Sequence, residues 1–381
     1  MDFHLGKKQK AIRDISRKFA REVAAPRAEE IERTGEHPYE IVAQMAELGM
    51  MGIPFPEDYG GGGGDWVSMH LCIEELSRAD VLLGAILDVT TSVVAQELLI
   101  FGTEEQKQRW LVPIAQGTEL GAFGLTEPDA GSDAAAVKTT AVLEGENWVV
   151  NGSKQFITNT GLDNTSIMII TAKTQRESDG KTIICTIIVP KDAPGFKVGQ
   201  KYEKMAQRGS ANHELFFDDC RVPRDFLLGD INRGFAQHLA VLQTGRISIA
   251  AIATGLAQAC FDEAMAFIRQ GSQGNRSLFR SQRVPFKLAD IAMRIELSRT
   301  MYLKAAWLKD QEERHTLEAN FAKLYGSETA TTIAAEVLKI FGPYGYLDEY
   351  PISRYFKQAK LFEIVEGTSE IQRLIIAREL L

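Results

Sequence analysis

The stretch Thr182-Ile-Ile-Cys-Thr-Ile-Ile-Val189 contains seven β-branched residues among its eight and is followed by Pro190. β-Branched side chains suit the pleated surface of a strand, and a short apolar run bounded by proline is typical of a buried strand. Trp148-Val-Val150 and Ile167-Met-Ile-Ile170 repeat this composition upstream. The sequence therefore predicts a β-domain in the middle of the chain, over residues 118–225.

The regions on both sides of this β-domain have a helical period. Ile12, Ile15 and Phe19 recur at spacings of three and four, and long apolar runs cover residues 247–266 and 331–340. No alternation of strands and helices and no GxGxxG turn occurs, which argues against a Rossmann domain. We expect a mainly α fold with a middle β-domain, divided into a helical domain at 1–117, the β-domain at 118–225 and a second helical domain at 226–381.

The composition excludes several classes of protein. The chain has 381 residues, and its 51 acidic and 43 basic side chains give a net charge of −8, which argues against binding to nucleic acid. The four cysteines have no CxxC spacing and the six histidines have no i, i+4 pair, so neither disulfides nor a metal site is expected. No secretory leader pattern and no uninterrupted apolar run of membrane-spanning length occurs, which favours a cytoplasmic protein without a membrane span.

The segment Phe123-Gly-Leu-Thr-Glu-Pro-Asp-Ala-Gly-Ser-Asp133 is rich in turn residues. Its backbone N–H groups and the hydroxyls of Thr126 and Ser132 could hold a polar ligand. Alone, the segment is equally well interpreted as a solvated loop.

The segment Leu361-Phe-Glu-Ile-Val-Glu-Gly-Thr-Ser-Glu-Ile-Gln-Arg373 places Glu366 before a glycine and a helix start, with Ser369 and Gln372 spaced as a capping box. Free N–H groups and the positive end of the helix dipole favour a developing anion there. A carboxylate beside such a site can remove a proton next to a carbonyl. The alternative is a surface glutamate near a helix N-terminus.

These two segments, with Asn151-Gly-Ser-Lys-Gln-Phe-Ile-Thr-Asn159 between them, resemble in order and spacing the motifs of the acyl-CoA dehydrogenase family. The resemblance runs from about residue 5 to 380 and is closest to the short-chain, butyryl-type branch. It implies an N-terminal helical domain, a β-barrel-like middle domain and a C-terminal four-helix bundle. It also implies FAD as cofactor, an acyl-CoA substrate from fatty acid or alicyclic acid metabolism, an electron-transfer flavoprotein as partner, and a homotetramer made as a dimer of dimers.

The resemblance also implies individual roles. The residues that would contact the cofactor are Phe123, Leu125, Thr126, Gly131, Ser132, Phe156, Thr158, Gln282, Lys339, Gly342, Thr368 and Glu370. The residues that would contact the substrate are Ser132, Thr244, Gly245, Arg246 and Gly367.

The mechanism implied is α,β-dehydrogenation. Glu366 would take the Cα proton while flavin N5 receives hydride from Cβ, and the Glu366 N–H and a flavin ribitol hydroxyl would hold the thioester oxygen. Exclusion of water on substrate binding should raise the pKa of Glu366. Some branches of the family carry the base at the position of Gly245, so here no second residue competes for the role.

The sequence departs from the family pattern at the adenine end of FAD. Relatives carry arginine and phenylalanine where this chain has Gly271 and Gly274, so a cation that grips the pyrophosphate of the neighbouring subunit's FAD is missing. We hypothesise that Lys339 compensates. The other candidate cations are Arg269, Arg276 and Arg280.

Asp88 is unusual in a segment that lines the acyl pocket of relatives. Because an unpaired buried carboxylate is unfavourable, it suggests a polar partner or a functional role. A second carboxylate there could select a polar or cyclic acyl group, or act as a base for a more distant proton. The alternative is that Asp88 caps the following helix through the backbone of Thr91 or Ser92.

Two other functions are compatible with these motifs. A protein of the same fold could run as an enoyl-CoA reductase, or act as a flavin oxidase or monooxygenase. A chain with weakened flavin binding could instead serve as a CoA-ester binding protein.

Overall fold

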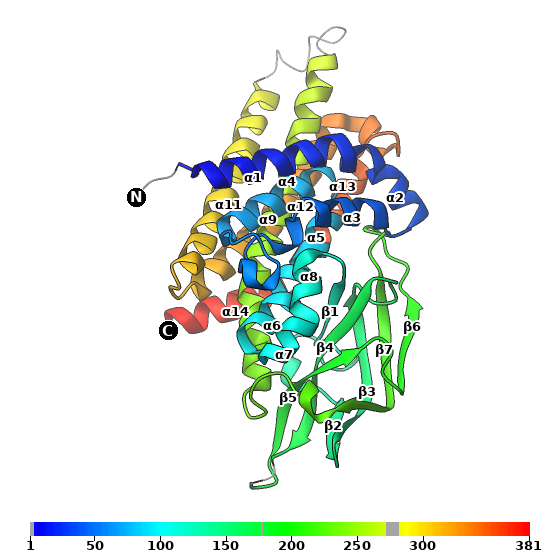
Figure 1. Cartoon of the computed structure of the whole chain (residues 1–381). Coiled ribbons are helices and arrows are strands. Elements are labelled where there is room, and N and C mark those ends of the chain that lie inside the picture. Colours follow the sequence, from blue (N-terminus) through cyan, green and yellow to red (C-terminus); the bar gives the residue numbers. More distant parts are fainter. Residues whose placement is uncertain (1–3, 177, 272–281) are drawn as a thin grey trace.

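Three consecutive segments form an N-terminal group of helices, a β sheet and a C-terminal bundle of long helices (Figure 1). The computed structural model describes residues 4–176, 178–271 and 282–381. The expectation of a mainly α fold with β structure in the middle of the chain is confirmed.

The N-terminal part consists of short helices. Asp65 caps α4 by accepting a hydrogen bond from the Ser68 N–H, and Asp80 starts α5 by accepting one from the Leu82 N–H. The elements are α1 (Lys7–Phe19), η1 (Ala20–Ala24), η2 (Ala25–Arg27), α2 (Ala28–Thr34), α3 (Tyr39–Glu47), η3 (Met50–Gly52), η4 (Glu57–Tyr59), α4 (Trp66–Ala79), α5 (Val81–Leu87), η5 (Asp88–Ala95), α6 (Gln96–Phe101), α7 (Glu104–Gln106), η6 (Lys107–Leu111) and α8 (Val112–Gln116).

The middle part is a mixed sheet. The three β-rich runs of the sequence lie in β3, β4 and β5, as expected. The strands follow the order β1-β4-β2-β3-β7-β6, with β5 paired to β4; β1 and β4 run parallel, while β3 and β7 run antiparallel. The elements are β1 (Leu120–Gly124), η7 (Ala134–Ala136), β2 (Thr140–Glu144), β3 (Asn147–Thr158), β4 (Thr165–Gln175), β5 (Thr182–Pro190), β6 (Phe196–Lys201), β7 (Asn212–Pro223) and η8 (Arg224–Phe226).

The C-terminal part is built on three long helices. The elements are α9 (Gly234–Gly271), α11 (Arg283–Asp310), α12 (Thr316–Phe341), η9 (Gly342–Tyr346), α13 (Ile352–Ala359), η10 (Lys360–Glu363) and α14 (Ser369–Leu380). The first turn of α9 docks on β5, because the Thr186 hydroxyl donates to the Gly234 carbonyl at 3.0 Å. α9 then runs through the centre of the molecule against helices of both the N-terminal and C-terminal parts (Figure 1).

Among the residues that the structure describes, two segments are long and apolar enough to cross a membrane, Val81–Phe101 and Gly234–Gln270. In each, a window of that length is mostly buried inside the protein, 78% and 83% respectively. Both segments are therefore core helices, which explains their apolar composition without a bilayer.

The hydrophobic core has two regions. One joins the helices of the N-terminal and C-terminal parts and includes Met45, Leu76, Ile252 and Ile333. The other lies between the sheet and the helices packed on β1, and it contains Val94 and Leu98 from those helices together with strand residues such as Ile169. Because α9 contacts both the helical bundle and the sheet, the residues near its first third lie where the three parts meet.

Candidate active site

Glu366 lies in the loop between η10 and α14, with a left-handed backbone (φ 52°) that non-glycine residues rarely adopt. Its carboxyl oxygen Oε2 is buried and has no hydrogen-bond partner among the described residues. A β-carbon built on Gly245 would lie 2.2 Å from that oxygen, so any larger residue at this position of α9 would force the carboxyl group to move. The structure thus brings together Glu366 and Gly245, two of the residues to which the resemblance assigns roles.

Arg246 follows Gly245 on α9 and is almost completely buried. Its Nε and Nη1 atoms have no partner among the described residues. Burial lowers the pKa of Arg246, and the negative charge of Glu366 opposes that change. An unpaired buried guanidinium is costly unless it pairs with an anion. Arg246 is therefore both a counter-charge for Glu366 and a free set of donors at the site.

Asp88 faces Glu366 from η5 and is 1% exposed. Its carboxyl group is within hydrogen-bonding reach of Glu366 and of the Ser248 hydroxyl, and burial and the neighbouring Glu366 raise its pKa well above the usual range. Burial also raises the pKa of Glu366, while Asp88, Arg246 and the buried Lys323 oppose that rise. Because the rise in pKa is larger for Asp88 than for Glu366, a proton shared by the two carboxyl groups is held mainly by Asp88.

The capping interpretation of Asp88 is wrong. The helix continues from α5 into η5 through Asp88 in helical backbone geometry, with no cap hydrogen bond from a side chain. The apolar period of this segment does not reveal whether a helix ends there, so the sequence could not exclude a cap.

A polar network beneath Asp88 was not predicted from the sequence. The Ser248 hydroxyl lies 2.9 Å from Ser92 Oγ and 3.2 Å from Nε2 of His70, whose Nδ1 lies 2.7 Å from the Trp66 carbonyl. Burial lowers the pKa of His70 to about 4. His70 is therefore neutral at pH 7, and the network adds hydrogen bonds but no charge below the carboxyl pair.

The first motif follows β1. The Phe123 ring stacks on His238 with a centroid distance of 3.7 Å, and Nδ1 of His238 lies 3.0 Å from Oε1 of the buried Glu97. Leu125 and Thr126 come next, where the Thr126 carbonyl accepts from the Gln155 N–H at 2.9 Å. Gly131 and Ser132 lie beyond them on the exposed part of the loop.

This loop is fixed by a buried ion pair that the sequence did not reveal. Lys154 Nζ lies 2.8 Å from Glu127 Oε1, with side chains 0% and 4% exposed, and also donates to the Leu125 carbonyl at 3.3 Å. Glu127 further accepts from the N–H of Lys138 at 2.5 Å. Glu127 belongs to the motif at 123–133 and Lys154 to the motif at 151–159. The presence of both motifs was therefore the one sequence signal that could have indicated this ion pair.

Phe156 and Thr158 lie at the end of β3. Phe156 has a φ of 61° and is 58% exposed, with its ring 4.9 Å from that of Tyr202. The Thr158 hydroxyl oxygen accepts from Asn212 Nδ2 at 2.7 Å, which leaves its own proton to donate elsewhere. An exposed aromatic ring can stack on a flat ligand ring, and a nearby hydroxyl can donate a hydrogen bond to a polar atom of that ring. Phe156 and Thr158 are therefore suited to bind a flat, polar ring system.

The remaining predicted residues divide into two groups. Thr244 is buried beside Gly245, and Gly367 and Thr368 adjoin Glu366; Thr368 caps α14 by accepting from the Ile371 N–H at 3.3 Å. The capping box predicted for Ser369 and Gln372 is therefore wrong: the cap is Thr368, and the third helical residue, Ile371, has no polar side chain to complete a box. Glu370 is exposed in the first turn of α14.

The second group lies away from Glu366. Lys339 is exposed on α12, sixteen residues or about 24 Å of helix beyond Lys323. Gly342 follows the end of α12, and Gln282 is exposed before α11. Gly271 ends α9, while Gly274, Arg276 and Arg280 lie outside the described residues.

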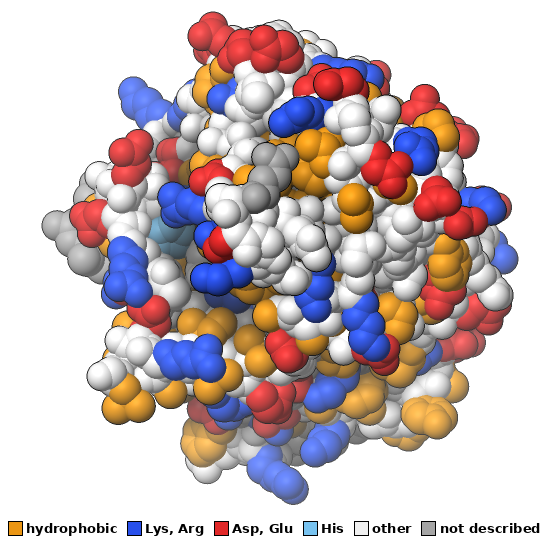
Figure 2. All heavy atoms as spheres, turned by 90° about the horizontal axis from the view of Figure 1, so that it is seen from below, with side chains coloured by type: hydrophobic (Ala, Val, Ile, Leu, Met, Phe, Trp, Pro, Cys, Tyr) orange, Lys and Arg blue, Asp and Glu red, His pale blue; other side chains and the backbone are white. Residues whose placement is uncertain are grey.

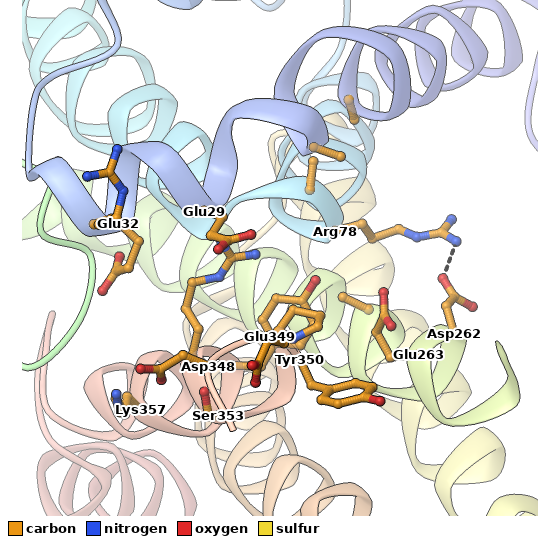
Figure 3. A pocket seen from close by; sticks show the side chains of 18 of the residues that line it. Glu29, Glu32, Arg78, Asp262, Glu263, Asp348, Glu349, Tyr350, Ser353 and Lys357 are labelled. Carbon is orange, nitrogen blue, oxygen red and sulfur yellow. Dashed lines mark hydrogen bonds and ion pairs between the residues drawn. The ribbon is translucent and has the colours of Figure 1, made fainter. Parts of the chain in front are cut away.

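A cavity of about 800 Å³ opens elsewhere, between the N-terminal helices, α9 and α13 (Figure 3). Acidic and basic side chains line it together, and several of them pair with one another: Arg78 Nη2 lies 2.5 Å from Asp262, and Arg17 lies 2.6 Å from Glu75. Because the positive and negative side chains that line the cavity offset one another, the cavity has no excess charge that would attract an ionic ligand. The catalytic candidates therefore remain at the junction of η5, α9 and the Glu366 loop.

Sequence patterns describing the acyl-CoA dehydrogenase N-terminal, middle and C-terminal domains match residues 6–118, 122–220 and 232–381. The chain belongs to the acyl-CoA dehydrogenase family. A probable acyl-CoA dehydrogenase of Bacillus subtilis (strain 168) is 49% identical over 381 residues, covering 100% of both chains.

Solved structures agree with this membership. A butyryl-CoA dehydrogenase from Megasphaera elsdenii matches with a TM-score of 0.95 and 38% identity, covering 100% of both chains. A chain in the structure of an electron transferring flavoprotein of Acidaminococcus fermentans matches with a TM-score of 0.96 and 40% identity, again over 100% of both. The protein is thus an oxidoreductase of the acyl-CoA dehydrogenase family, similar to its short-chain, butyryl-type members.

Proposed function

We propose that this acyl-CoA dehydrogenase carries out FAD-dependent α,β-dehydrogenation of a short-chain or cyclic acyl-CoA thioester, with Glu366 as the base. The observation that carries the proposal is the buried, unpartnered Oε2 of Glu366 beside the unpaired donors of Arg246. A carboxylate oxygen without a partner can accept a proton, and the adjacent cation keeps the group ionised until it does.

The proton step uses Glu366 and its own loop. The raised pKa of Glu366 makes its carboxylate a stronger base than an exposed one, which suits removal of a weakly acidic Cα proton. The Glu366 and Gly367 N–H groups have no backbone acceptor among the described residues and lie just before the N-terminus of α14. Donors at that position stabilise the negative charge that develops on a thioester oxygen.

The residues around the site fit FAD. The exposed Phe156 ring and the hydroxyl of Thr158 would hold the isoalloxazine, and Thr126, Ser132, Thr368 and Glu370 would hold the remainder of the cofactor. FAD, when bound, supplies the acceptor for the hydride that leaves Cβ. FAD and the CoA group of the substrate are both anions, whereas the net charge of the protein is −8. Lys and Arg side chains nevertheless gather around a hollow on the face seen in Figure 2, so the surface offers local positive charge for an anion.

Asp88 narrows the choice of acyl group. Its buried carboxyl group adds polarity beside the base, where a plain alkyl chain gains nothing from it. We therefore favour a polar or cyclic acyl group over a linear one. Turnover of a cyclohexene-carboxyl-CoA should exceed that of butyryl-CoA in a flavin-bleaching assay, and faster turnover of butyryl-CoA would remove this preference.

The partner assignments rest on surface and similarity. Electrons would pass to an electron-transfer flavoprotein, which the match to the Acidaminococcus structure supports. Exposed apolar side chains along α11 support a homotetramer, and light scattering of the purified protein tests that state. These side chains are Phe286, Met293, Leu297 and Trp307. We place this assembly in the cytoplasm.

Lys339 would contact the FAD pyrophosphate of a neighbouring subunit. Its exposure at the end of α12 leaves the ammonium group available for such a contact. A Lys339→Ala variant should lose FAD on desalting, and full retention would contradict the assignment.

Replacement of the base tests the function directly. Glu366→Gln keeps the shape of the side chain but cannot accept the proton, so turnover with an artificial electron acceptor should fall by at least about 10³-fold while FAD content is kept. Substantial turnover in this variant would overturn the proposal. Slow reoxidation of the reduced, product-bound enzyme in air separates a dehydrogenase from an oxidase.

A further inference from the structure

Lys323 on α12 is a fully buried lysine that no motif accounts for. Its Nζ donates to the Gly367 carbonyl at 2.6 Å. It projects from a face of α12 formed by the small residues Ala319, Ala322 and Gly326, which lets the side chain reach the loop of the base. A buried ammonium requires good acceptors, and the carbonyl next to Glu366 is one.

The loop that Lys323 holds has an unusual backbone. Glu366 (φ 52°) and Gly367 (φ 91°) are both left-handed, and such a conformation at a non-glycine residue persists only when its surroundings impose it. Gln372 Nε2 donates to the carbonyls of Glu366 at 3.2 Å and of Gly367 at 3.0 Å. The turn is therefore held by two side chains, a neutral amide from α14 and a cation from α12.

Lys323 also contributes charge. Three groups face Glu366 from different elements: Asp88 from η5, Arg246 from α9 and Lys323 from α12. Lys323 in turn faces Glu366 and Arg246, together with Glu363 from η10 and Glu328 from α12. Burial lowers the pKa of Lys323 to about 8, so the group carries most of its charge at neutral pH.

We propose that Lys323 is the positioning residue of the catalytic base: its ammonium clamps the Gly367 carbonyl and keeps Glu366 ionised in a buried site. This inference rests on the proposed function, in which Glu366 removes the Cα proton. In this role Lys323 acts through the Gly367 carbonyl, to which its Nζ donates, and not through contact with substrate or cofactor.

Two variants separate the clamp from the charge. Lys323→Met removes both at similar side-chain length, whereas Gln372→Met removes two carbonyl contacts without changing charge. The pH dependence of kcat/KM is measured for both, with FAD content and circular dichroism as controls. We expect the acid limb of the Lys323→Met profile to move upward by about one pH unit or more, because an opposite charge has been lost. At a fixed pH below that limb, kcat/KM should then be about tenfold lower for each pH unit by which the limb moves. The Gln372→Met variant should lose rate but keep the acid limb of the wild type.

The outcomes distinguish this inference from the function on which it rests. If Glu366→Gln is inactive and Lys323→Met keeps the wild-type acid limb, the charge role of Lys323 is overturned and Glu366 remains the base. If Gln372→Met moves the acid limb as far as Lys323→Met does, loop geometry rather than charge is responsible, which also overturns it. If Glu366→Gln is active, the proposed function itself fails. Should Lys323→Met not fold, Lys323→Gln carries the same test with the same expected displacement of the acid limb.

Discussion

The β-carbon that any other residue would carry at position 245 falls 2.2 Å from Oε2 of Glu366, so the two positions share one volume. We predict that Gly245→Ala lowers kcat by about 10²-fold, because displacement of a catalytic group by an ångström has effects of that size. Alanine is about 1 kcal/mol better than glycine inside a helix, so the loss should occur without loss of stability.

The matched control for this change is Gly326→Ala on α12. There the added carbon would lie 3.1 Å from Ser298 Oγ, a contact that a small movement relieves, and Glu366 is not among its near neighbours. Thermal unfolding and steady-state rates measured on both variants decide the matter: full activity of Gly245→Ala would show that the carboxyl group can move.

The shared proton of Asp88 and Glu366 predicts a bell-shaped pH profile. At low pH both carboxyl groups are protonated and no base is present; at high pH Asp88 loses its proton and places a second negative charge where charge must develop. Asp88→Asn keeps a hydrogen-bond donor toward Glu366 but has no proton to lose. We expect its kcat/KM profile to keep the acid limb and lose the alkaline one.

An alkaline limb that persists in Asp88→Asn would contradict this assignment and place the titration on another group. Asp88→Leu provides the comparison, because it removes the donor as well. Since the hydrogen bond from Asp88 lowers the pKa of Glu366, the leucine variant should show an acid limb displaced upward.

The ion pair of Lys154 and Glu127 should matter for stability. Both side chains are buried, and removal of one partner leaves an uncompensated charge, so Lys154→Met should lower the free energy of unfolding by about 3–5 kcal/mol. Denaturant unfolding measures the loss, and the double variant Lys154→Met with Glu127→Leu should recover part of it. The exposed pair of Lys138 and Asp129 is the control, for which we expect no measurable change. Equal losses at both pairs would be incompatible with this account.

His70 predicts a specific loss of stability in acid. Burial lowers its pKa to about 4 from 6.5, so between these values the unfolded chain binds a proton that the folded chain does not. Stability therefore falls as the pH drops through this window, by up to about 1.4 kcal/mol per pH unit. Burial also lowers the pKa of His37, which adds to the loss of stability in acid. The pKa values of Asp80 and Asp310 are raised to about 6, so these two groups instead stabilise the folded protein as the pH falls.

The His70→Gln variant isolates this contribution. Its free energy of unfolding should depend less steeply on pH between 6.5 and 4 than that of the wild type, whatever its absolute value. Parallel slopes in urea unfolding would mean that His70 is protonated in the folded protein.

The sequence was most informative where a signal is local. The β-branched runs of β3, β4 and β5 depend on side-chain shape, and Glu366 was proposed as the base from its place before Gly367 and a helix start. Helix continuity is less local: Asp88 resembled a cap because capping and mid-helix positions share the same polar residue types.

The buried charges could not be predicted in the same way. Lys323 and Lys154 have acidic or carbonyl partners more than twenty residues away, and a lysine in a periodic helix or strand is ordinarily solvated. For Lys323 a weak signal existed, because the residues one turn to either side, Ala319 and Gly326, are small. Small neighbours on one face indicate close packing there, and a lysine on that face must find an internal partner.

The length of α9 has a thermodynamic consequence. Its 38 residues span about 57 Å. Its first turn docks on β5, and the rest of the helix packs in the helical core. Gly245 and Arg246 lie between these two regions of the helix. Melting of either core would therefore release the residues that surround the base, so the chain should unfold as one cooperative unit. Because a ligand held at the junction binds only the folded form, it should raise the melting temperature of helices and sheet together, by an amount set by its concentration relative to its Kd.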